Sequence, residues 1–194
     1  MKPRMMIVIG PSGSGKSTLY PVSSFGVAYY NADDRAAALN GNSYRAIPRT
    51  SRRRVNQEFE EFIAECIRQQ ESFAIETTLR SSVTFDQARH AGRNGFIVEM
   101  KYLSLASFEI HLERVKARAD AGGHSAPASV LRGIYDASLG NLRQAIREMD
   151  ILKVHDNTTL DAEHPLLLES RNGTITYVAE PMPVWLHQAI AASK

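Results

Sequence analysis

The sequence predicts an α/β fold of three layers, in which a mostly parallel central sheet lies between helices. First, segments with the pattern of strands alternate with segments of helical periodicity, as in βαβ units. Second, residues 5–9 are all apolar, which is typical of a central parallel strand. Third, a glycine-rich turn follows that strand directly. Neither an internal repeat nor a linker interrupts the pattern, so we expect a single domain over residues 1–194.

Three strands and three helical segments are expected in the first half of the chain. Apolar side chains at helical spacing predict the longest of these helices. The strands are expected at residues 5–9, 25–31 and 72–75. The helices are expected at residues 16–24, where Pro21 interrupts early, at 35–50 as a short helix with a loop, and at 52–70.

The second half continues the alternation and ends differently. Gly95 is the expected stop of one helix and Ser107 the expected cap of the next. Helices are expected at residues 82–94, from 107 and at 128–149, strands at 96–105 and 150–155, and a loop at 120–127. An Asn-Gly turn predicts a β-hairpin over residues 166–178, and a short C-terminal helix closes the chain.

The turn after the first strand has the P-loop spacing, in which four residues separate a glycine from Gly-Lys-Ser. Its glycines let backbone N–H groups approach phosphate oxygens. Lys16 is expected on the β- and γ-phosphates, and the Ser17 hydroxyl on Mg²⁺. The alternative, a glycine–serine surface loop, does not explain the preceding strand. The predicted nucleotide-binding residues are Gly10, Pro11, Ser12, Gly13, Ser14, Gly15, Lys16, Ser17 and Thr18.

Acidic side chains stand where the expected strands end. In a parallel sheet these ends face one crevice. Asp33 is the candidate base for an acceptor hydroxyl, and Glu76 is a candidate for Mg²⁺ water or for substrate. Asp156-Asn157 ends the fifth strand. The alternative for each carboxylate is a helix cap or a loop position.

Arginines flank the glycine-containing loop, which is typical of a lid over a transferred phosphate. The lid is expected at about residues 119–128, with Arg118 and Arg132 stabilising the phosphoryl group. For Arg114, a solvated helix face is an equal alternative. The run Arg52-Arg53-Arg54 is read as a solvated helix start, with substrate-phosphate binding as the alternative.

Composition excludes several classes of protein. The net charge of +2 argues against nucleic-acid and membrane partners, and no apolar run is long enough to span a membrane. Cys66 is the only cysteine, so no intramolecular disulfide forms, and the scattered histidines lack zinc-site spacing. Guanine-recognition and transporter-ATPase motifs are absent. We therefore expect a cytoplasmic protein.

Taken in order, the motifs resemble those of zeta-toxin-like P-loop kinases from residue 5 to about residue 157. The shared marks are the P-loop, Asn31-Ala32-Asp33, Glu76-Thr77-Thr78-Leu79, Arg114 to Arg118 with Gly122-Gly123-His124, Asn141-Leu142 and Asp156-Asn157. The sequence departs from the family pattern at Ser125-Ala126 and Gly133-Ile134. These departures indicate a different acceptor at the lid.

The resemblance implies an adenylate-kinase-like core that uses ATP and Mg²⁺. It implies Asp33 as the base, Glu76, Thr78 and Arg80 as substrate-binding positions, and Arg118 and Arg132 as phosphate-stabilising groups. The best-known members phosphorylate a UDP-linked amino sugar and are restrained by an antitoxin.

We therefore expect an ATP-dependent kinase that acts on a hydroxyl of a small molecule. One alternative is a nucleotide-binding ATPase or switch whose output is a protein partner, such as an antitoxin-like protein. Another is a kinase of nucleic-acid ends, against which the near-neutral charge argues.

Overall fold

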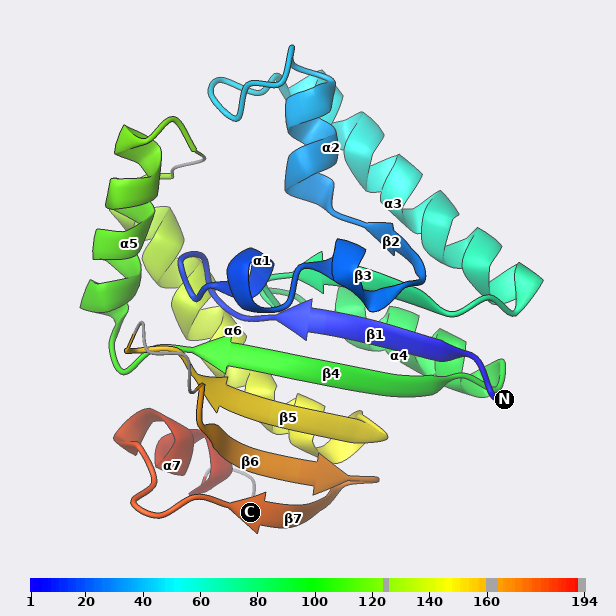
Figure 1. Cartoon of the computed structure of the whole chain (residues 1–194), viewed down its shortest axis with the longest axis vertical. Coiled ribbons are helices and arrows are strands. Elements are labelled where there is room, and N and C mark those ends of the chain that lie inside the picture. Colours follow the sequence, from blue (N-terminus) through cyan, green and yellow to red (C-terminus); the bar gives the residue numbers. More distant parts are fainter. Residues whose placement is uncertain (124–125, 160–163, 192–194) are drawn as a thin grey trace.

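The computed structural model of the protein describes residues 1–123, 126–159 and 164–191. It confirms the predicted α/β fold, with seven strands in one sheet ordered β2-β3-β1-β4-β5-β6-β7 (Figure 1). The strands are β1 (Arg4–Ile9), β2 (Ala28–Tyr30), β3 (Phe73–Thr77), β4 (Ile97–Ser104), β5 (Ile151–Asp156), β6 (Leu166–Arg171) and β7 (Thr174–Val178). Among the described helices, none has both the length and the apolar character needed to cross a membrane.

The first five strands are parallel, and the predicted hairpin adds two antiparallel strands beside β5. At the end of β1, Ile9 is in register with Thr77 of β3 and Tyr102 of β4. The turn that follows Ile9 is therefore flanked by the carboxyl ends of both neighbouring strands.

Helices cover both faces of the sheet. The main core packs α3, α4, α6 and α7 against one face, including Ile7, Phe73 and Met100. A smaller cluster around Val8 and Leu103 packs the short N-terminal helices on the other face. The helices are α1 (Lys16–Leu19), η1 (Val22–Phe25, a 3₁₀ helix), α2 (Ala32–Ala38), α3 (Arg49–Gln69), α4 (Val83–Arg93), α5 (Phe108–Asp120), α6 (Ala128–Glu148) and α7 (Val184–Ala191).

The helix that opens at Lys16 is interrupted at Pro21, as the sequence predicts. Pro21 cannot donate the backbone hydrogen bond that would continue the helix, so α1 ends at Leu19 and a separate 3₁₀ turn, η1, follows. That turn also delays β2, which begins at Ala28 instead of residue 25.

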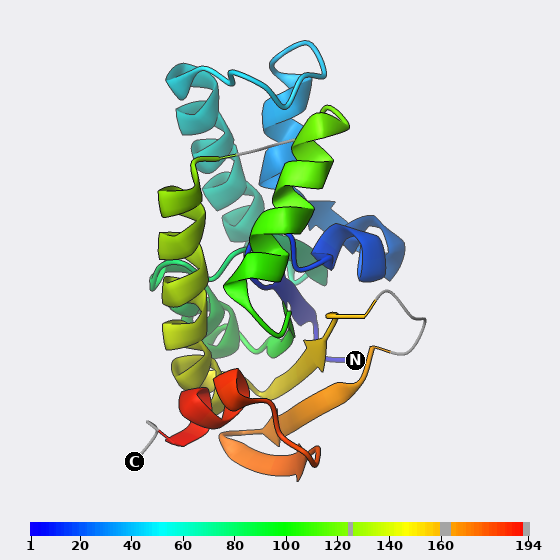
Figure 2. The ribbon, with the colours of Figure 1, turned by 90° about the vertical axis from the view of Figure 1, so that its left-hand side faces the viewer.

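Two helical hairpins rise beyond the carboxyl ends of the parallel strands. Figures 1 and 2 show α2 with α3 as one pair and α5 with α6 as the other. The loop between α2 and α3 leans toward the end of α5 in Figure 1, and Arg45 of that loop donates to the Ala119 carbonyl at 3.2 Å. The two pairs therefore meet where the α2–α3 loop contacts the end of α5.

Candidate functional site

The turn after β1 depends on glycine for close approach as well as for conformation. Gly10 and Gly15 have φ of 149° and 90°, in the region where other residues are strained. A Cβ on Gly10 would lie 2.1 Å from the Leu103 carbonyl oxygen, and one on Gly15 would lie 2.1 Å from Asn157 Nδ2. Because α1 has only four residues, the backbone of the turn itself is the part of this region best suited to surround phosphate.

Lys16 is buried beneath that turn. Its Nζ donates to the carbonyls of Gly10 at 2.8 Å and Pro11 at 3.2 Å. Burial lowers the pKa of Lys16, while the charges of Glu76 and Asp33 act in the opposite direction. The ammonium is thus held inside the loop, with two carboxylates close enough to influence its protonation.

Ser17 and Glu76 come together across neighbouring elements. The Ser17 hydroxyl donates to the carboxylate of Glu76, at 2.9 Å from Oε2 and 3.1 Å from Oε1. Burial raises the pKa of Glu76, and the charge of Lys16 opposes that shift. Hydroxyl and carboxylate oxygens are ligands that Mg²⁺ accepts, and it commonly uses one or two protein ligands beside phosphate and water. These two residues therefore fit a magnesium ion.

Asp33 lies in the first turn of α2 and does not end a strand. Asn31 caps this helix, and its Oδ1 accepts from the backbone N–H groups of Asp33 at 3.0 Å and Asp34 at 3.3 Å. The charge of Asp33 acts to raise the pKa of Lys16, against the effect of burial, and also acts to raise the pKa of Glu76. The structure therefore gathers Lys16 and Ser17 of α1, Glu76 of β3 and Asp33 of α2 into one site.

Ion pairs with Glu58 of α3 hold α2, and with it Asp33, against α3. The carboxylate of Glu58 accepts hydrogen bonds from Arg35 Nε at 2.6 Å and from Arg54 Nε at 2.8 Å. These hydrogen bonds hold the pKa of Glu58 down at about 2. The Tyr30 hydroxyl donates to the Val55 carbonyl at 3.1 Å beside these ion pairs.

The three candidate arginines occupy different surroundings. Arg118 is in the last turn of α5, and its charge lowers the pKa of Lys16, which places it near the site. Arg132 Cζ lies 4.5 Å from the centre of the Phe108 ring, and its Nε is 4.0 Å from Asp136. Arg114 donates to the Thr158 carbonyl at 2.8 Å, beside the segment after β5.

The segment after β3 is held from α6. Thr78 is partly buried and Arg80 is exposed. Between them, buried Leu79 has φ of 56°, and its carbonyl accepts from Asn141 Nδ2 at 2.9 Å. Asn141 therefore fixes an unusual backbone turn between the two substrate-binding candidates.

Two residues that the motif analysis did not assign to the site brace the P-loop. His111 Nδ1 lies 3.1 Å from the Ser12 carbonyl oxygen, and burial lowers the pKa of His111 to about 4. Asn157 Nδ2 donates to the Ser14 carbonyl at 2.8 Å. The available signals were the position of Asn157 at a strand end and that of His111 one turn before Arg114. The lid prediction includes His124 and Ser125, which lie outside the described residues.

Comparison with solved structures identifies proteins of the same fold. A chain of the PezAT chromosomal toxin–antitoxin system of Streptococcus pneumoniae matches with a TM-score of 0.62 and 12% identity, covering 97% of this chain and 84% of that one. A candidate kinase from Chloroflexus aurantiacus matches with a TM-score of 0.61 and 17% identity, covering 84% and 92%. A chain of the Pnkp1/Rnl/Hen1 RNA repair complex matches with a TM-score of 0.58 and 19% identity, covering 73% and 46%. At these identities the likeness concerns the fold.

Sequence comparison covers the part of the chain that forms the site. An uncharacterized protein of Haemophilus influenzae is 29% identical over 136 residues, which are 70% of this chain and 94% of that protein. The model of the AAA_33 family, described as an AAA domain, matches residues 5–137, and this match takes in the P-loop, Asp33, Glu76 and Arg118. The chain thus belongs to the AAA_33 family, on the fold of P-loop kinases.

Proposed function

We propose that the protein is a kinase that uses ATP and Mg²⁺ to phosphorylate a hydroxyl of a small molecule, with UDP-sugars among the candidate acceptors. The observation that carries the proposal is the convergence of Lys16, the Ser17–Glu76 pair and Asp33. Phosphoryl transfer needs a phosphate cradle, a metal site and a carboxylate that can take a hydroxyl proton. Membership of the AAA_33 family supports the proposed binding of a nucleotide, and the fold supports the proposed kinase class.

In this proposal the residues have separate tasks. The backbone of residues 10–15 and Lys16 bind the phosphates, and Ser17 and Glu76 hold Mg²⁺, which spreads the negative charge of the phosphates when it is bound. Asp33 orients the acceptor hydroxyl and accepts its proton as the oxygen attacks phosphorus. Thr78 and Arg80 flank the acceptor beside Glu76.

The arginines complete the proposed site from the α5–α6 pair. Arg118 stabilises charge on the transferred group. Arg132 has the same proposed task, for which its side chain must leave the ring of Phe108. This requirement predicts that the Arg132 side chain changes its position when the site is filled.

A second candidate function is a nucleotide-dependent switch that acts on a protein partner. The similarity in fold to a chain of the PezAT toxin–antitoxin system supports an antitoxin-like partner. A kinase of nucleic-acid ends is less well supported, because the net charge is only +2.

The deciding experiment measures ADP release with Mg²⁺ and ATP, with and without a panel of UDP-sugars and other hydroxyl compounds. Lys16→Ala should abolish turnover. Asp33→Asn should lower acceptor-dependent turnover by roughly 10²- to 10⁴-fold while the variant still binds ATP. The matched control is Asp34→Asn, whose carboxylate accepts the Tyr44 hydroxyl at 2.8 Å and has no proposed part in proton transfer.

The outcomes separate the candidates. A phosphorylated acceptor, identified by its mass, establishes the kinase and names its substrate. Slow turnover that depends on Lys16 and ignores every acceptor favours the switch. Near-normal turnover of Asp33→Asn, or an equal loss in Asp34→Asn, would show that Asp33 is not the base.

A further inference from the structure

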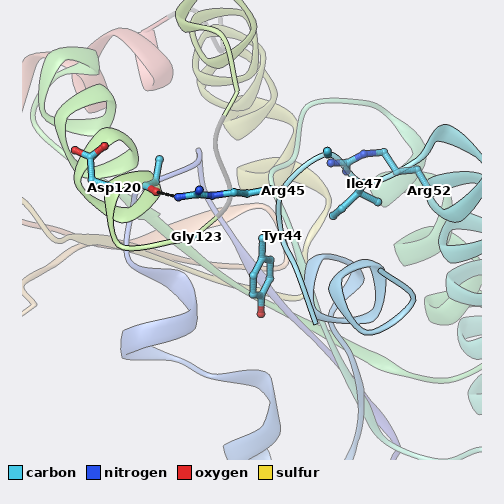
Figure 3. A pocket seen from close by; sticks show the side chains of 8 residues that line it. Tyr44, Arg45, Ile47, Arg52, Asp120 and Gly123 are labelled. Atoms are coloured by element: carbon cyan, nitrogen blue, oxygen red, sulfur yellow. Dashed lines mark hydrogen bonds between the residues drawn. The ribbon is translucent and has the colours of Figure 1, made fainter. Parts of the chain in front are cut away.

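A hollow lies between the α2–α3 loop with the start of α3 and the end of α5. It has a volume of about 380 Å³, within the range of small-molecule sites. Figure 3 shows how the two sides face each other across it. The α2–α3 side contributes Tyr44, Arg45, Ala46, Ile47 and Arg52, and the α5 side contributes Ala119, Asp120 and Gly123.

The hollow carries uncompensated positive charge. Arg45 uses one donor on the Ala119 carbonyl, and its planar fork retains others. Within the described residues Arg52 has neither an ion pair nor a side-chain hydrogen bond, although its neighbour Arg54 is paired with Glu58. In Figure 3 the carboxylate of Asp120 points away from Arg45.

Tyr44 connects the hollow to the acidic residues of α2. Its hydroxyl donates to Asp34, and the charges of Asp33 and Arg118 both act on it. Tyr44 thus joins the hollow that Arg45 and Arg52 line to the first turn of α2, which carries Asp34 and the proposed base Asp33.

We propose that this hollow binds an anionic group, carboxylate or phosphate, at the end of the acceptor opposite its reacting hydroxyl. The inference rests on the proposed kinase function and deepens it. Arg45 and Arg52 supply the guanidinium forks that match either anion. Ala46 and Ile47 supply apolar wall for the carbon skeleton between the two ends.

Charge selection follows from this arrangement. An anionic acceptor gives the two arginines a charged partner that the protein does not supply, whereas an uncharged sugar does not. The Arg52-Arg53-Arg54 run thus divides by task, because Arg52 lines the hollow, Arg54 pairs with Glu58, and Arg53 does neither.

The test is calorimetric binding to the protein saturated with AMPPNP and Mg²⁺, so that the P-loop is already filled. The probes are glucose, gluconate, glucose 6-phosphate and UDP-N-acetylglucosamine. The first three share a six-carbon skeleton and differ in charge, which separates carboxylate from phosphate recognition. At least one anion should bind roughly tenfold or more tightly than glucose.

Variants assign the binding to the hollow. Arg52→Gln should weaken the favoured anion about tenfold and leave glucose unchanged. Arg45→Gln should do the same, and Arg53→Gln, an exposed arginine of the same helix, should not. The inference is overturned if no anion binds better than glucose, or if Arg53→Gln weakens binding as much as Arg52→Gln. Because binding is measured without turnover, this result is independent of whether any probe is phosphorylated.

Discussion

At the scale of single residues, burial and neighbouring charges act in opposite directions on the pKa values of the site. Burial lowers the pKa of Lys16 and raises the pKa of Glu76, and each charge partly offsets the effect on the other. Such groups cost folding free energy and are typical of functional sites. Replacing them should therefore separate stability from activity.

Glu76→Gln should make the protein more stable and less active. Because the folded pKa of Glu76 is raised, its stabilising contribution is complete below the unfolded value of 4.5 and is lost as pH rises through the folded pKa. Glutamine avoids that loss, so urea unfolding at pH 7 should show a gain that disappears near pH 4. Turnover should fall, because the proposed metal site loses its charge. Glu71→Gln, an exposed control, should change stability by less than about 0.5 kcal/mol. A less stable Glu76→Gln at pH 7 would contradict this account.

His111 should make the protein sensitive to mild acid. Its folded pKa of about 4 lies below the ordinary value of 6.5, chiefly because of burial. Its contribution to stability is therefore present above pH 6.5 and is lost as pH falls toward 4, by up to on the order of 3 kcal/mol.

The measurement compares the free energy of unfolding at pH 7.5 and pH 4.5. His111→Gln should flatten the difference, and the exposed control His90→Gln should not. If the difference in unfolding free energy between the two pH values is unchanged in His111→Gln, His111 is not the source of the acid sensitivity.

At the scale of elements, α6 and the segment after β3 act as a unit. Asn141→Ala removes the donor to the Leu79 carbonyl, so it should destabilise the protein by about 1–2 kcal/mol. It should also raise the KM for the acceptor more than it changes kcat, because Thr78 and Arg80 flank that carbonyl. Gln144→Ala, which loses an exposed bond to Glu148, is the matched control and should stay within about 0.5 kcal/mol. If Asn141→Ala and Gln144→Ala change stability and the acceptor KM equally, the hydrogen bond of Asn141 has no special part in holding this segment.

Periodicity and turn residues predicted most elements because those signals are local. The spacing of apolar residues located α3, and Asn172-Gly173 located the turn between β6 and β7. Pro21 predicted the early interruption of the helix that begins at residue 16, because proline lacks the N–H that would continue it.

The site was less readable from the sequence because its contacts cross long stretches of chain. Glu76 and Ser17 are both visible in motifs, but their hydrogen bond depends on the pairing of β1 with β3. The contact between His111 and Ser12 joins residues 99 positions apart. No local pattern encodes such a contact. The expectation that the carboxyl ends of parallel strands meet at one edge of the sheet applies only to carboxylates at those ends.

For the whole molecule, the sheet order makes nucleotide binding and folding stability interdependent. The P-loop follows the central strand β1 and is contacted by α5 through His111 and by the end of β5 through Asn157. A ligand that fills the loop should therefore stabilise the fold as a whole.

ATP with Mg²⁺ at about 100 times its Kd should raise the Tm by about 5–10 °C, from ~2.7 kcal/mol of binding linkage in a chain of this length. EDTA should reduce the shift, because Ser17 and Glu76 then lack the ion they are proposed to hold. Lys16→Ala should abolish it, and differential scanning fluorimetry provides the measurement. A full shift in Lys16→Ala would mean that ATP binds elsewhere.

The hydrogen bond from Asn157 to Ser14 also ties the P-loop to a much later part of the chain. The residue that fixes the P-loop backbone is synthesised 143 positions after Ser14. Nascent chains that end before Asn157 hold a loop without this brace. We therefore expect the P-loop to gain its full rigidity only once the fifth parallel strand, β5, is in place.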